Sequence, residues 1–188
     1  MGTLKVDEIR STSAHDDANA ITLSGNNATL TSNVVFPAGH VLQVVTGNRK
    51  IATTTQTTTP VETNLEASIT PSSTSNKIQV FVTGMWGLSG HNLMKFYLYR
   101  GGSNIITGTN GDAWSILQHQ IESQSSSWAN GFGTSLALSY IDSPSSTSSL
   151  LYELYFACDN ASPTLYFNRR PQSDNPGYSQ ITLMEIVA

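Results

Sequence analysis

The residues that could carry out catalysis are few and scattered in this chain. The four histidines stand singly, and neither a His-x-His pair nor an H-E-x-x-H motif is present; they are His15, His40, His91 and His119. The sequence also contains no G-x-S-x-G nucleophile elbow and no phosphate-binding P-loop. We therefore predict a protein that is not an enzyme, with no catalytic residues, no metal site and no cofactor.

A glycan-degrading enzyme would need two carboxylates that face each other across a groove. Four acidic residues are candidates, namely Asp112, Glu122, Asp142 and Glu153. Their spacing favours no particular pair. The segment Thr109–Asp112 offers oxygen ligands for calcium, but it lacks the remaining ligands of a calcium-binding loop, and we predict a turn there.

The single cysteine, Cys158, excludes an intrachain disulfide. It ends the apolar run LYFAC and has no basic or histidine neighbour in the sequence that would activate its thiol. We predict a small buried residue.

Aromatic and basic residues in loops are the better candidates for function. Trp86, Trp114 and Trp128 all lie among Gly, Ser and Asn, which is typical of contact surfaces. For Trp86 and Trp114 we favour a core position at a strand end, whereas the surroundings SSSWANG predict an exposed Trp128. Arg169 and Arg170 follow TLYFN and could bind an anionic group or be solvated. The candidate receptor contacts are therefore Trp128, Arg169 and Arg170.

Composition excludes several classes of partner. The chain has 188 residues, 12% of them charged, and a net charge of −4, so it lacks the basic surface that nucleic acid requires. Three Trp, seven Tyr and six Phe argue against disorder. No apolar region follows the N-terminal Lys5 and Arg10, and no run approaches the roughly 18 apolar residues of a membrane span. We expect synthesis in a cytoplasm and no membrane insertion.

Alternating apolar residues separated by polar turns predict an antiparallel β-sandwich or jelly roll from residue 41 onward. The expected strands are 41–46, 53–59, 65–70, 77–83, 93–100, 105–107, 134–141, 150–158, 164–168 and 180–187. Residues 114–122 fit a helix or a strand, and we favour a strand. Gly101-Gly102 predicts a hairpin turn.

The last strand, ITLMEIVA, has apolar residues on both faces. Ile181, Leu183 and Val187 would lie on one face, and Met184 and Ile186 on the other. Such a strand is central in its sheet or lies at a subunit contact.

Residues 1–40 contain short β-like pieces with too few apolar side chains to form a core alone. We predict that three copies intertwine and pair with one another, which would remove exposed strand edges. The side chains expected at the common axis are Ile21, Leu23, Leu30, Val34 and Val35. The predicted architecture is thus an all-β homotrimer, with an extended stalk over residues 1–40 and a sandwich head over 41–188.

Several segments, in this order, resemble a known group of proteins. They are GTLKVDEIRSTS, ITLSGNN, VVFPAGHVLQVV, SITPSSTSNKIQVFV, LYRGG, LSYIDSPSSTSSLLYELYF and ITLMEIVA. The chain resembles small tail-fibre and virion structural proteins of tailed bacteriophages, especially those of marine and cyanobacterial hosts. The resemblance implies a homotrimer located in the virion, an N-terminal segment that attaches to other virion proteins, and a β-sandwich head without catalytic residues.

Three functions are compatible with these observations. The first is a short fibre whose head contacts a glycan or protein on the host surface. The second is a capsid decoration, head fibre or adaptor with a purely structural role. The third is a glycan depolymerase. The sequence leaves open the anchoring virion protein, the receptor, tail or capsid location, and the presence of an ion on the axis.

Overall fold

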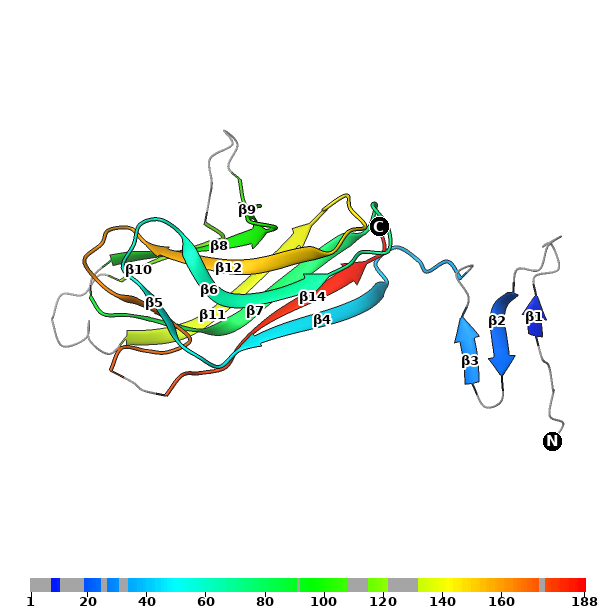
Figure 1. Ribbon diagram of the computed structural model, residues 1–188, viewed down its shortest axis with the longest axis horizontal. Coiled ribbons are helices and arrows are strands. Elements are labelled where there is room, and N and C mark those ends of the chain that lie inside the picture. The colour runs from blue at the N-terminus through cyan, green and yellow to red at the C-terminus, as the bar shows by residue number, and fades with distance from the viewer. Residues whose placement is uncertain are drawn as a thin grey trace. The chain divides into compact units, whose positions relative to one another are not determined.

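The computed structural model describes residues 8–10, 19–24, 27–30, 34–90, 92–107, 115–121, 132–172 and 175–188 (Figure 1). In these residues the regular structure is entirely β, and every strand pair is antiparallel, so the predicted all-β class is confirmed. No helix in this part of the chain is long and apolar enough to cross a membrane. The chain divides into two compact units, Met1–His40 and Val41–Ala188.

The first unit contains a small sheet in the order β1-β2-β3, built from β1 (Glu8–Arg10), β2 (Asn19–Ser24) and β3 (Asn27–Leu30). The sequence predicts that these segments pair with other copies, but in the structure they pair within one chain. Residues 34–36 belong to the part of the chain where short β-like pieces are expected, but they form no strand. Among the described residues, the outer edges of β1 and β3 have no strand partner, and such edges can pair with another chain.

The second unit contains two sheets (Figure 1). The first sheet has the order β4-β14-β7-β13-β5, and β11 also pairs with β7. Its strands are β4 (Val41–Arg49), β5 (Thr53–Thr55), β7 (Lys77–Leu88), β11 (Phe132–Asp142), β13 (Leu165–Phe167) and β14 (Ser179–Ile186). The second sheet has the order β10-β8-β12-β6, and β9 also pairs with β8. Its strands are β6 (Val61–Ile69), β8 (Asn92–Arg100), β9 (Ser103–Asn104), β10 (Leu117–Ile121) and β12 (Leu150–Cys158).

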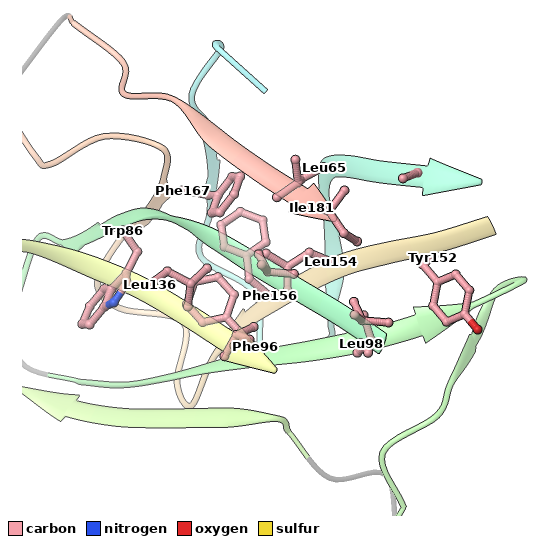
Figure 2. Close-up of a cluster of buried hydrophobic side chains, with 14 of the residues drawn as sticks. Leu65, Trp86, Phe96, Leu98, Leu136, Tyr152, Leu154, Phe156, Phe167 and Ile181 are labelled. Carbon is pink, nitrogen blue, oxygen red and sulfur yellow. The ribbon is translucent and has the colours of Figure 1, made fainter. Parts of the chain in front are cut away.

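The core lies between the two sheets, as expected for a sandwich. Alternate residues of the strands point inward, so that both sheets contribute to one apolar cluster (Figure 2). The rings of Phe96 and Phe156 stack with centroids 6.3 Å apart, and Phe167 of the first sheet meets both edge-on. Burying each such side chain contributes about 1.5–3 kcal/mol. Trp86 is 1% exposed, which confirms its predicted core position.

Most of the predicted strands are present. Residues 117–121 form a strand, and the Gly101-Gly102 turn joins β8 to β9, with positive φ angles of 56° and 79°. β14 lies between β4 and β7, as its two apolar faces predict. Residues 105–107 form no strand of their own, and the threonine-rich strand is limited to Thr53–Thr55.

β6 begins at Val61 rather than at the predicted residue 65. The prediction missed its first residues because a polar residue occupies a core position there. Thr63 is fully buried, and its hydroxyl donates to the carbonyl of Leu154 at 2.7 Å. A buried hydroxyl with a partner is tolerated in a core, but it interrupts the apolar alternation that marks a strand in the sequence.

β7 runs the length of the sandwich and defines its two ends. At the base, β7 begins at Lys77, opposite Ile186, which also lies opposite Val41, the first residue of this unit. At the tip, β7 ends at Leu88, opposite both Phe132 and Leu165. Figure 2 shows Tyr152 and Trp86 at opposite ends of the labelled side chains.

Candidate contact site

The predicted receptor contacts Arg169 and Arg170 directly follow β13, at the tip of the first sheet. Trp128 lies outside the described residues. β10, which precedes it in the sequence, ends toward the tip at Ile121. β11, which follows it, begins toward the tip at Phe132. The structure therefore places both arginines toward the tip and does not place Trp128.

An aromatic ring that the sequence reading missed lies beside Arg169. Tyr166 points outward, since its neighbours Leu165 and Phe167 are both fully buried. The guanidinium carbon of Arg169 lies 4.8 Å from the centre of the Tyr166 ring, a cation–π arrangement that restrains both side chains. The alternation of buried and outward residues in TLYFN was the signal that could have identified Tyr166.

Arg170 lies against β11 at a position that has no side chain, Gly133. A Cβ atom at Gly133 of β11 would lie 2.7 Å from the Cβ of Arg170, so only glycine leaves room there. Gly133 lies opposite Gly87, which lies opposite Tyr166. We call Tyr166, Arg169 and Arg170 the arginine–tyrosine cluster. Two glycines, Gly87 and Gly133, thus lie beside this cluster.

The loop carrying the arginines begins at a tightly held residue. Asn168 is fully buried with a φ of 65°, and its amide nitrogen donates to the carbonyls of Arg49 (3.0 Å) and Gly177 (2.9 Å). Its side-chain oxygen accepts from the Ser179 hydroxyl at 2.8 Å. These bonds fix the backbone immediately before Arg169, so the cluster starts from a rigid point.

A polar hollow adjoins the cluster. Thr54 lies opposite Tyr166 in the sheet, and it lines an open hollow together with Thr55, Gln56, Thr57 and Thr164. The Gln56 amide donates to the Thr164 hydroxyl at 2.8 Å. Hydroxyl and amide groups can donate and accept hydrogen bonds, the ring offers an apolar surface, and the arginines offer positive charge. Such a set can bind a ligand, and it contains no nucleophile paired with a base.

At the base, a buried carboxylate joins the two sheets. Asp142 of β11 accepts a hydrogen bond from the Tyr152 hydroxyl at 2.6 Å and an ion-paired one from Arg100, both from the second sheet. Burial, followed by the hydrogen bond to Asp142, raises the pKa of Tyr152. The base is therefore closed by a polar contact between the sheets.

A second buried carboxylate, Glu185, accepts hydrogen bonds from neutral donors. The donors are the Gln43 amide (2.6 Å), the Ser72 backbone nitrogen (2.6 Å) and hydroxyl (2.7 Å), and the Asn76 amide (2.7 Å). Burial opposes ionisation, but the bonds from Asn76, Gln43 and Ser72 outweigh it and lower the pKa of Glu185.

The four acidic residues considered for glycan cleavage do not form a described pair. Asp142 is engaged between the sheets, Glu153 is on the outer side of β12, and Asp112 and Glu122 lie outside the described residues. Within the described ranges, no group of three or more His, Cys, Asp or Glu side chains is arranged to hold a metal ion.

Cys158 is buried, as predicted. Its sulfur lies 3.6 Å from the Pro163 carbonyl and 3.8 Å from that of Thr55, and burial raises the pKa of the thiol. A buried, protonated thiol is unreactive.

The residues predicted for a trimer axis lie in the first unit. Ile21 and Leu23 belong to β2, but their side chains are outside the described part. Leu30 is 55% exposed and Val35 91% exposed, while Val34 is half-buried. Their role at an axis stays a prediction.

Comparisons with known proteins give no family assignment. No family model matches the chain, and no curated protein matches its sequence. Among solved structures, the chain is similar to the VP2 subviral particle of infectious bursal disease virus (TM-score 0.37, 8% identity, 85% of this chain and 45% of that one). It is also similar to structures of the Gt strain of that virus (0.36, 11%, 96% and 47%) and the Gx strain (0.34, 12%, 90% and 42%). The chain spans less than half the length of each, and at these scores the likeness assigns no function to it.

Proposed function

We propose that this chain is a non-enzymatic structural protein of a bacteriophage virion, most specifically a short trimeric fibre. In this proposal residues 1–40 attach to other virion proteins and form the trimeric stalk. The head over residues 41–188 contacts the host surface through its tip. The resemblance of the sequence segments to phage fibre proteins supports the class of protein.

The strand order of the head supports a jelly roll. One layer reads β4, β14, β7 and β11, and the other reads β6, β12, β8 and β10. The chain passes between the layers from β4 to β6, β7 and β8, stays in the second layer for β10, and then alternates through β11, β12 and β14. This winding is that of double-sheet jelly rolls, which occur in viral capsid and lectin domains. The support is by analogy of fold, because one fold serves many functions.

The polarity of the head is the observation that carries the proposal. The chain enters the head at Val41 and β14 ends at Ile186, both at the base. The arginine–tyrosine cluster and the hollow beside it lie toward the other end. A head held at its base would present these groups outward, which is the arrangement that a receptor-contacting fibre requires.

Binding to an array of bacterial O-antigens and capsular polysaccharides, acidic and neutral, tests the contact role. We expect the purified full chain to bind acidic polysaccharides. The double variant Arg169→Gln/Arg170→Gln should lose about tenfold or more in affinity, because each charged hydrogen bond contributes about 1.5–3 kcal/mol. Lys77→Gln, which removes an exposed cation at the base, is the matched control and should bind as the unchanged protein does.

Two further measurements separate the alternatives. Antibody labelling of intact particles should place the protein on the tail. A position on the shell, together with no glycan or cell binding, would instead support a capsid decoration or adaptor. Release of reducing sugar from a bound polysaccharide would contradict the non-enzymatic proposal.

A further inference from the structure

The outer side of the first sheet is unusually apolar near the base. Val44 lies opposite Met184, and Met184 lies opposite Gln79. Gln79 in turn lies opposite Ile141, which completes a row across four strands. Val44 and Ile141, at the two ends of this row, are each 54% exposed among the described residues. We define the apolar face as Val41, Val44, Phe81, Ile141, Met184 and Ile186.

The concentration of exposed apolar residues on this one face is notable. Four of the eight large apolar side chains that are exposed in the described residues belong to it: Val41 (40%), Val44 (54%), Phe81 (39%) and Ile141 (54%). Single apolar residues on a surface need no explanation, but a contiguous group marks an interaction site.

Charge is nearly absent from the same side of the sheet. Among the described residues that β4, β7, β11 and β14 direct outward, Lys77 at the rim of the base is the charged one. The amide nitrogen of Gln79 donates to the Ser139 hydroxyl (2.9 Å) and to the carbonyls of Val80 and Tyr140 (3.1 Å each). The apolar face therefore offers little to a charged partner.

The outer side of the second sheet has the opposite character. Glu153 lies directly opposite Glu66, and Glu62 accepts a hydrogen bond from Tyr155 at 2.8 Å. Burial, and then the charges of Glu62 and Glu66, raise the pKa of Glu153. Two copies that met through this side would bring like charges together, in a protein whose net charge is already −4.

We propose that the apolar face packs against a second copy of this chain, around the axis of the trimer proposed above, on which this inference rests. A copy fits because the face is uncharged, so its burial against the same sheet of a neighbour leaves no charge unpaired. The face also begins at Val41, where residues 1–40 join the head. If residues 1–40 of three copies associate, they hold the three apolar faces at a high effective concentration.

Cross-linking of paired cysteine variants of the full chain tests the proposal. Ser139→Cys places a thiol beside Phe81 on the first sheet, and Ser68→Cys places one on the outer side of β6; both serines are exposed. The native Cys158 is buried and stays in both variants. With a short bis-maleimide, Ser139→Cys should give about tenfold more cross-linked product than Ser68→Cys, since its thiols share a high effective concentration.

The oligomeric mass separates failure of this inference from failure of the trimer. A chain that sediments as a monomer at every concentration would overturn both. A trimer in which Ser139→Cys cross-links no better than Ser68→Cys would overturn the assignment of the face alone. As a second measurement, Phe81→Lys should lower the trimer fraction in dilute solution while the circular dichroism spectrum is unchanged. An unchanged trimer fraction would also count against the face.

Discussion

Two neighbouring rows of the first sheet, near the base, reverse the usual distribution of side chains. The inward row consists of Gln43, Glu185, Ile78 and Asp142. The outward row lies one residue away on each strand and consists of Val44, Met184, Gln79 and Ile141. Thus two carboxylates lie inside the sandwich, and three apolar side chains lie on its outer surface.

The two rows differ in what their side chains contact. The inward carboxylates have partners: Asp142 bonds to the second sheet, and Glu185 bonds to the segment before β7. A fully bonded polar network fixes one arrangement of the elements that it joins. The outward row has exposed apolar surface and no described cover, which suits contact with another molecule.

The largest expected effect comes from placing one substitution in each row. Ile78→Thr should lower the free energy of unfolding by about 3 kcal/mol, because it removes buried apolar volume and buries a hydroxyl. Ile141→Thr, at a side chain that is 54% exposed, should change it by less than about 0.5 kcal/mol in dilute solution. Chemical denaturation measures both values. Equal losses in the dilute protein would show that the outward row is packed within its own chain.

The sequence predicts much of the fold because the strands obey a simple alternation. Ile78, Val80 and Val82 alternate within the expected strand 77–83, and all three are buried. The inward row could not be predicted, since Asp142 and Glu185 look like solvated charges until the second sheet and residues 72–76 supply their partners. Pairing across distant segments carries no local signal.

The candidate contact site was predictable only in part. A pair of adjacent arginines after a strand is visible in the sequence, but the position of Tyr166 beside Arg169 depends on which face of β13 is buried. The position of Gly133 beside the arginine–tyrosine cluster depends on its pairing with β7. The pairing of β1, β2 and β3 within one chain was missed, because the few apolar residues there gave no indication that the backbone would find its partners locally.

A smaller effect is expected from removing the carboxylate that joins the sheets. Asp142→Ala leaves the Tyr152 hydroxyl and the Arg100 guanidinium without their acceptor, which should cost about 2 kcal/mol. The cost stays below that of a fully buried pair because Arg100 is 28% exposed and can reach water. Tyr152→Phe, which keeps the ring and the ion pair, should cost about 1 kcal/mol. If Asp142→Ala unfolded no more easily than Tyr152→Phe, the ion pair would contribute nothing to closing the base.

The smallest expected effect is a dependence of the free energy of unfolding on acid pH, which arises from Glu185 in the inward row. Hydrogen bonds hold the pKa of Glu185 below its unfolded value, so the folded protein binds fewer protons than the unfolded chain where the two pKa values differ. The resulting stability is fully present above the unfolded pKa, near 4.5, and is lost as the pH falls through the folded pKa.

Glu185→Gln isolates this contribution, because glutamine keeps the size of the side chain and does not titrate. The free energy of unfolding, measured between pH 7 and pH 3, should fall less steeply in the variant than in the unchanged protein below about pH 4.5. Ile141→Thr, in the outward row, should leave the acid slope unaltered. Parallel slopes for Glu185→Gln and the unchanged protein would mean that Glu185 titrates in the folded protein as it does in the unfolded chain, and the contrast between the two rows would then rest on Asp142 alone.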